Sequence, residues 1–136
     1  MIRPIVRDES LLCTPAEKAT NKDRQVITDL KDTLRAHSTH CAGMAANMIG
    51  ENKSIIIVSD GAEDIVMVNP RIIAKQQPYD TEEGCLSLTG VRKVTRYERI
   101  TVEYLDEGFH KKTGRFEGFT AEAIQHECDH LAGKII

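Results

Sequence analysis

The chain has 136 residues, of which 40% are hydrophobic and 29% are charged, and its net charge is −3. This balance fits one compact soluble domain and excludes a disordered or membrane-spanning chain. The scattered Lys and Arg residues argue against nucleic-acid binding, which normally needs a basic patch. Residues 1–7 hold no apolar run long enough for a signal peptide or a membrane span, so we expect a cytoplasmic protein with reduced thiols. No repeat or linker divides residues 1–136, which predicts a single domain.

The first half of the chain predicts a helix followed by strands. Apolar residues recur at helical spacing between Asn21 and Ala36, and Thr20 or Asn21 is a suitable N-cap. The aliphatic run 54–59 predicts a buried strand. Residues 65–68 predict another strand, which we expect to end at the Asn69-Pro70 step.

The second half predicts more β structure. We expect short strands at 71–74, 91–94 and 100–105, a turn at 106–108, and a hairpin across Thr113-Gly114 that pairs 109–112 with 115–119.

A final helix is expected from about Thr120, which is a good N-cap, with Glu122 in the first turn to suit the helix dipole. Apolar residues lie around much of its circumference, which is typical of a buried central helix. The coarse fold class is therefore α+β.

That helix carries a pattern typical of a metal site. His126 and His130 are four residues apart, so they project from one face and can bind one divalent ion, while Glu127 can reach a water molecule beside it. The alternative is coincidence on a surface helix. Burying two His, a Glu and Asp129 without partners would cost several kcal/mol, which favours the metal site.

Cys85 is the best candidate for a third ligand, because its thiolate is soft and charged and Gly84 allows a close backbone approach. Cys128 points from another helix face and is expected to pack in the core, and Cys13 reads as a loop thiol. The remaining histidines have no spacing relationship to this pattern and are expected to be exposed: His37, His40 and His110.

Three segments together resemble the signature motifs of the peptide deformylase family. They are residues 41–50, Glu83–Ser87 and Gln125–Leu131, and the similarity spans nearly the whole chain. The resemblance implies an α+β fold with antiparallel sheets around a central metal-binding helix, in one catalytic domain over residues 1–136.

The resemblance also implies the chemistry. Cys85, His126 and His130 would bind one divalent ion, typically Fe²⁺ with Zn²⁺ or Ni²⁺ as substitutes. Glu127 would act as general base and then as proton donor, in a reaction that removes the N-formyl group from N-formylmethionyl peptides and releases formate. The backbone N–H of Leu86 would stabilise the oxyanion.

For the substrate, the resemblance implies contacts with Gly43, Met44, Gly84 and Leu86, and Ile124 would help to form the methionine pocket. A transient ribosome contact is compatible with such a substrate. Gln125 and Asp129 are expected to orient His126 or a neighbouring loop.

The first motif departs from the family pattern, because Cys41 replaces a glycine and Met48 replaces a glutamine that donates to the oxyanion. Losing one such donor typically costs about 10²–10³ in turnover. Asn47 carries an amide one position earlier, but that offset would aim it differently. Two alternatives therefore stay open: a catalytically weak homologue that binds metal and formyl-peptides, and a His-Glu-x-x-His metallopeptidase, which Cys85 disfavours.

Overall fold

The computed structural model describes residues 1–37, 42–85 and 88–134. In chain order the elements are α1 (Glu9–Leu12), the 3₁₀ turn η1 (Asn21–Asp23), α2 (Arg24–Ala36), β1 (Gly43–Ala45), the 3₁₀ turn η2 (Ala46–Ile49), β2 (Ile55–Ser59), β3 (Asp64–Cys85), β4 (Leu88–Leu105), β5 (Lys111–Glu117) and α3 (Gly118–Leu131).

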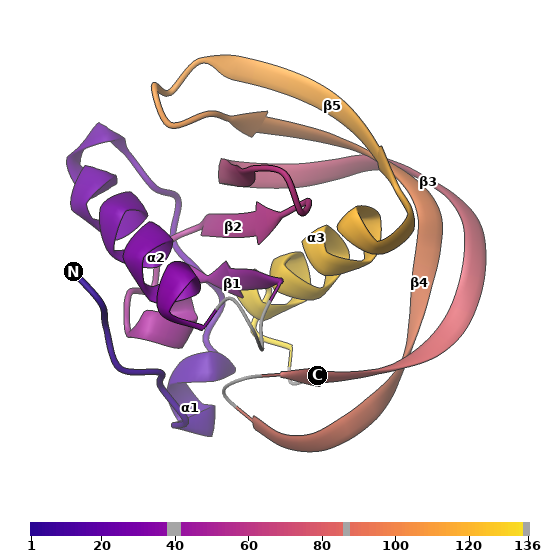
Figure 1. Ribbon diagram of the computed structural model, residues 1–136, viewed down its shortest axis with the longest axis horizontal. Helices are drawn as coiled ribbons and strands as arrows, with labels where there is room; N and C mark the ends of the chain where they lie inside the picture. The colour runs from indigo at the N-terminus through magenta and orange to yellow at the C-terminus, as the bar shows by residue number, and fades with distance from the viewer. Residues whose placement is uncertain (38–41, 86–87, 135–136) are drawn as a thin grey trace.

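The strands form one antiparallel sheet in the order β1-β2-β3-β4-β5, and this sheet curves around α3 (Figure 1). Its longest part is the β3–β4 ribbon, whose pairing runs from Val68 opposite Leu105 to Cys85 opposite Leu88. The expected α+β fold with antiparallel strands around a central helix is confirmed. The strands form a single continuous sheet, because β3 and β4 bend at irregular positions and stay paired beyond them.

The Asn69-Pro70 step is such a bend, and our expectation that it ends a strand is wrong. The pairing register shifts between Val68 and Arg71, and Asn69 has a φ of 51°. The Asn69 side chain accepts a hydrogen bond from the N–H of Ala19 (2.8 Å) and donates one to its carbonyl (3.0 Å). These bonds fix an irregularity that a strand would otherwise avoid, so β3 continues through it.

The prediction of a hairpin across Thr113-Gly114 is also wrong, because Gly114 lies inside β5 opposite Val102. The turn lies at 106–110, where the Asp106 carboxylate accepts hydrogen bonds from the backbone N–H groups of Gly108 (2.9 Å) and His110 (3.0 Å). A side chain at position 114 would meet the Phe116 ring at 2.8 Å. Gly114 therefore provides space for an aromatic ring.

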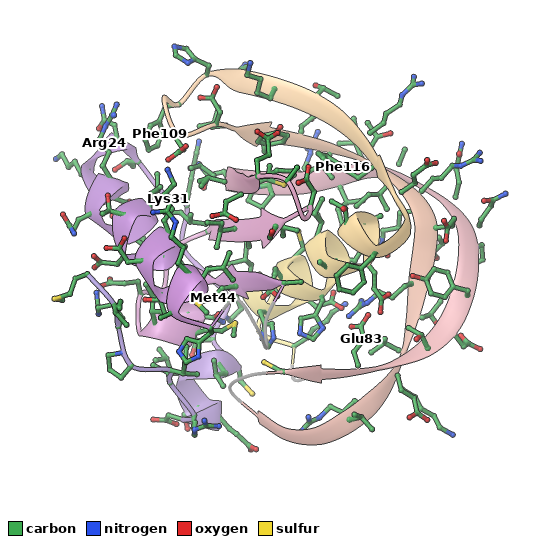
Figure 2. All side chains as sticks on the ribbon, in the orientation of Figure 1. Arg24, Lys31, Met44, Glu83, Phe109 and Phe116 are labelled. Carbon is green, nitrogen blue, oxygen red and sulfur yellow. The ribbon has the colours of Figure 1, made fainter. Side chains whose placement is uncertain are left out.

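The helices follow the sequence closely. The predicted first helix corresponds to η1 and α2, and Thr20 caps it by accepting a hydrogen bond from the N–H of Lys22. Arg24 at its start lies over the Phe109 ring, 5.3 Å from its centroid (Figure 2). The second predicted helix corresponds to α3, which begins at Gly118, so our expectation that Thr120 is its N-cap is wrong.

The core lies between α2, the concave face of the sheet and α3, and it is mostly aliphatic. Most of α3 is buried, including three of its ionisable side chains: His126, Glu127 and His130. In the part of the chain that the structure describes, no helix has the length and apolar character needed to cross a membrane.

Candidate metal centre

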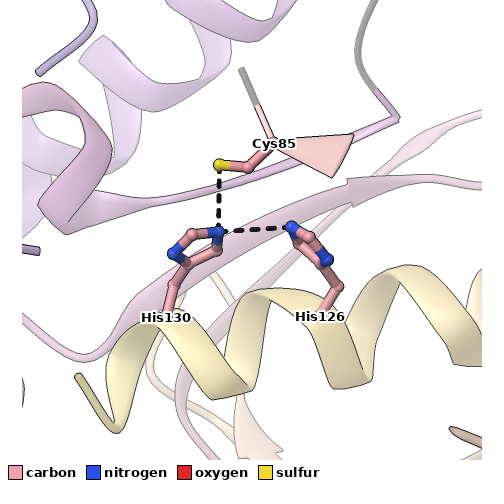
Figure 3. A group of neighbouring side chains, drawn as sticks. All are labelled: Cys85, His126 and His130. Atoms are coloured by element: carbon pink, nitrogen blue, oxygen red, sulfur yellow. Dashed lines mark hydrogen bonds between the residues drawn. The ribbon is translucent and has the colours of Figure 1, made fainter. Parts of the chain in front are cut away.

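Three side chains converge where the end of β3 meets α3 (Figure 3). His130 Nε2 lies 3.1 Å from Cys85 Sγ and 3.2 Å from His126 Nε2. The three atoms all lie within 4.8 Å of one another. The three residues that the sequence indicates as ligands are therefore brought together.

Different elements supply these ligands. The two histidines lie one turn apart on α3, so their rings leave the same face of the helix, with ring centroids 4.9 Å apart. Cys85 is the last residue of β3, and the curvature of the β3–β4 ribbon brings it over that face. The centre thus depends on the sheet and the helix being packed correctly.

A buried polar network supports His126. Its Nδ1 lies 2.7 Å from the Glu83 carboxylate, which also accepts hydrogen bonds from Arg96 at 2.7–3.1 Å. Arg96 donates a further hydrogen bond to Asp129 (2.6 Å). Glu83, which is labelled in Figure 2, reaches this network from β3. Arg96 reaches it from β4. Because Glu83 binds Nδ1, the Nε2 atom of His126 is left facing the other two ligands.

The sequence did not single out Glu83 or Arg96. Glu83 belongs to the motif around Cys85, but nothing in the sequence assigns it a partner. Arg96 lies in a strand with alternating polar residues, where an arginine is normally exposed. Its side chain is 5% exposed because two carboxylates from different elements surround it. Asp129, which we expected to orient His126 or a neighbouring loop, contacts Arg96, which in turn contacts Glu83.

The charges of this network favour a cation at the centre. Burial alone would raise the pKa of Glu83, but the hydrogen bonds from His126 and Arg96 lower it to about 2. Burial alone would lower the pKa of His126, but its hydrogen bonds to Cys85 and Glu83 and the nearby carboxylates raise it to about 10. Surroundings that favour positive charge on this imidazole also favour a bound cation.

The donor set agrees with this. A thiolate and two imidazoles form a borderline-soft, three-ligand set that suits divalent iron, zinc or nickel and leaves a position open for substrate or water. The residues present therefore fit a single divalent metal ion.

Glu127 lies next to His126 on α3, where it is buried and packed against Gly43 of β1. A Cβ at position 43 would lie 3.2 Å from Glu127 Oε2 and 3.2 Å from the carbonyl oxygen of Ile57. Glycine is therefore needed at this position because the carboxylate and β2 both come close. Burial raises the pKa of Glu127. Its Oε1 atom has no hydrogen-bond partner within the described residues.

A cavity of roughly 290 Å³ opens onto this centre. The predicted substrate contacts Gly43 and Gly84 lie along it, whereas the predicted contact Met44 and the pocket candidate Ile124 are fully buried and do not line it. Leu86, the expected oxyanion donor and a substrate contact, lies outside the described residues. The lining comprises Ala42, Gly43, Met48, Glu82, Glu83, Gly84, Cys85, Phe119, Glu122, His126 and Glu127.

Met48 and Asn47 have different surroundings. Met48 lines the cavity, and its sulfur accepts a hydrogen bond from the N–H of Ala45 (3.4 Å). The Asn47 amide instead donates to the carbonyl oxygen of His130 (2.9 Å) and fixes the end of α3. Asn47 is therefore engaged away from the cavity and is not positioned to replace the missing glutamine.

Among the residues that the structure describes, the other polar residues and cysteines named in the sequence analysis lie outside the group formed by Cys85, His126 and His130. Gln125 joins α3 to β4 through two hydrogen bonds with the backbone of Tyr97, each 2.8 Å. Burial raises the pKa of the Cys128 thiol to about 12, as expected for a packed cysteine, and Cys13 is exposed. His110 is exposed and His37 is half-buried, while His40 lies outside the described residues.

The sequence and the fold were compared with those of known proteins. A family model described as polypeptide deformylase matches residues 2–136. A peptide deformylase of Clostridium beijerinckii is 54% identical over 136 residues, which is 100% of each chain.

Two solved structures are also similar. A peptide deformylase from Legionella pneumophila is 34% identical, with a TM-score of 0.89 over 99% of this chain and 83% of that one. A class I type b peptide deformylase from Acinetobacter baumannii with Met-Ala-Ser bound is 28% identical, with a TM-score of 0.90 over 99% of this chain and 97% of that one.

Proposed function

This chain belongs to the polypeptide deformylase family and is a hydrolase that removes the N-formyl group from N-formylmethionyl peptides, and we propose which of its residues carry that reaction. The observation that carries the proposal is the convergence of Cys85, His126 and His130 beside the buried carboxylate of Glu127, at the floor of one cavity. The comparisons do not support the weak homologue or the metallopeptidase. We also propose that residues 1–136 act as one catalytic domain.

Deformylases are metalloenzymes, and we propose that Cys85 Sγ, His126 Nε2 and His130 Nε2 are the ligands in this chain. Ferrous iron is the proposed ion, and zinc or nickel would fit the same donors. When bound, the ion acts as a Lewis acid that polarises the formyl carbonyl and acidifies water. Glu83 holds His126 by its Nδ1 atom, so the ring keeps one orientation and one nitrogen for the ion.

Glu127 is the proposed general base and acid. Its Oε1 atom, which has no hydrogen-bond partner among the residues that the structure describes, accepts a proton from the attacking water, and the same carboxyl group then delivers that proton to the leaving amine. Burial, which raises the pKa of Glu127, helps it to hold the proton between the two steps. The products are formate and a peptide with a free amino group.

The oxyanion and the peptide need backbone partners. We propose the N–H of Leu86 as an oxyanion donor and the backbones of Gly43 and Gly84 as walls that bracket the peptide. Met44 lies fully buried beside Gly43, so its proposed contribution is to support that wall from behind.

The biological setting follows from the substrate. Formylmethionine begins nascent bacterial chains, so we propose that the protein acts in the cytoplasm and contacts the ribosome transiently.

The test is formate release from formyl-Met-Ala-Ser by iron-loaded protein prepared without oxygen. The turnover of the Glu127→Ala variant should be about 10²–10⁴-fold lower than that of wild type, because the variant lacks the general base. The variant should still bind one metal ion per chain. The Cys85→Ala variant should lose the metal itself. Equal turnover by wild type and Glu127→Ala at matched metal content would contradict the assignment of Glu127.

A further inference from the structure

Glu122 places a carboxyl group in the wall of the cavity that opens onto the metal centre. It precedes His126 by four residues, so it projects from the same face of α3 about 6 Å further along the helix axis. Phe119 lies one turn earlier still and lines the same cavity. None of the lining side chains within the described residues is a lysine or an arginine.

Glu122 shares one cavity with Cys85, His126 and Glu127, so a substrate that reacts at this centre comes close to it. The formyl group must react between the three ligands and Glu127. A side chain of methionine length that runs along α3 towards Phe119 covers about 6 Å, which matches the rise over the four residues from His126 to Glu122. The end of the side chain would therefore meet the Glu122 carboxyl group. An apolar group at this place leaves a partly buried oxygen without a partner, which costs binding energy.

The surroundings of Glu122 define what it can offer. His126 and Arg96 occupy the Glu83 carboxylate, so Glu83 is engaged away from any substrate side chain. Burial and the hydrogen bond to Glu83 raise the pKa of Glu122 to about 7. A carboxyl group keeps oxygen lone pairs in either protonation state, so Glu122 offers a hydrogen-bond acceptor in the cavity wall. A substrate group that complements this Glu122 oxygen must therefore be a hydrogen-bond donor.

We propose that Glu122 is a specificity-determining residue that extends the reaction to N-formyl peptides whose first side chain ends in a hydrogen-bond donor, such as glutamine. The inference rests on the deformylase reaction proposed above. The cavity wall of this chain is acidic at Glu122. A wholly apolar methionine pocket would have an aliphatic side chain at that position.

The experiment compares kcat/KM for formyl-Gln-Ala-Ser with kcat/KM for formyl-norleucine-Ala-Ser, because the two first side chains have similar lengths and only glutamine can donate. In Glu122→Met, which is apolar and unbranched, the ratio of the two values should fall about tenfold relative to wild type, as expected for one hydrogen bond. Glu122→Gln keeps a carbonyl oxygen and should hold the ratio within about threefold. Glu63→Gln removes an exposed charge in a distant turn and should leave it unchanged.

Metal content and melting temperature are measured for each variant, and Glu122→Leu replaces Glu122→Met if the latter does not fold. An unchanged ratio in the apolar variant would overturn the inference. A parallel loss with both peptides would also overturn it, because Glu122 would then only position Glu83. If wild type fails to cleave formyl-Met-Ala-Ser, the proposed function itself is wrong. This outcome is distinct from a failure of the Glu122 inference alone.

Discussion

Arg96 shows how much a single residue can depend on partners that lie far away in the sequence. Its guanidinium joins Glu83 of β3 to Asp129 of α3, and its side chain is 5% exposed. Removing one member of a buried charge network leaves the others uncompensated.

We expect Arg96→Ala to lower the free energy of unfolding by about 3–5 kcal/mol, since it leaves two carboxylates without their partner. The matched control is Arg99→Ala in the same strand. Arg99 pairs with Glu117 at 3.5 Å, but its side chain is 57% exposed, so the control should cost only about 0–1 kcal/mol. Urea unfolding of both variants measures the difference, and equal losses would mean that the network contributes little.

Met48 is the residue whose identity should limit the rate. A glutamine at this position would bring an amide donor to the cavity wall, where Met48 offers only a thioether. We expect Met48→Gln to raise kcat for formyl-Met-Ala-Ser by up to about 10², with little change in metal content. An unchanged kcat would show that backbone groups already satisfy the oxyanion.

At the scale of single residues, local patterns predicted which three side chains come together, but they did not predict the residues that support them. His126 and His130 share a helix face, and Cys85 follows a glycine, so local patterns indicated them. Glu83 and Arg96 are in contact across the β3–β4 ribbon, although its register places Glu83 opposite Arg92 and Arg96 opposite Tyr79. That register is a property of the fold and is not visible in either segment.

Among the elements, β3 differs most from its prediction, because it joins two predicted strands through Asn69 and continues to Cys85, where no strand was predicted. The asparagine combines a positive φ with two hydrogen bonds to Ala19, so the strand passes through a step that normally ends one. An Asn-Pro step normally ends a strand, but here a tertiary contact with Ala19 outweighs that tendency.

Two substitutions at Asn69 should separate backbone strain from side-chain bonding. Asn69→Gly loses both hydrogen bonds but tolerates the positive φ, and we expect a loss of about 1–3 kcal/mol in stability. Asn69→Ala loses the same bonds and adds about 1 kcal/mol of strain, so it should be the less stable of the two. Thermal unfolding gives the comparison, and the opposite order would mean that φ costs nothing here.

The same reasoning explains the elements that were predicted well. The first helix has a clear apolar period and a capping threonine, which are local signals. The turn at 106–110 was indicated by its aspartate and glycine, whereas Gly114 marks a packing requirement that has the same appearance in the sequence. Sequence patterns thus locate glycines without saying why they are needed.

For the whole molecule, Asp29 of α2 ties the N-terminal segment to the body of the fold. Burial alone would raise its pKa, but hydrogen bonds from Gln25, the N-terminal amine and Arg3 outweigh burial and lower it. A carboxyl group with a lowered pKa adds stability above its unfolded pKa of about 4, and this contribution is lost as the pH falls through the folded value.

We therefore expect Asp29→Asn to be less stable than wild type at neutral pH and the difference to shrink as the pH falls below about 4. Unfolding free energies measured across that range test this. A difference that stays constant with pH would show that Asp29 acts through packing and not through its charge.

The separation of the ligands along the chain has a consequence for the whole molecule. Cys85 and His130 are 45 positions apart, and the intervening residues make up β4, β5 and most of α3. A metal ion held by both would act as a topological cross-link that closes a long loop, and closure of long loops removes the most entropy from an unfolded chain that keeps the link. The ion would then give this chain the kind of constraint that a disulfide gives a secreted domain, and the constraint would be removable by a chelator.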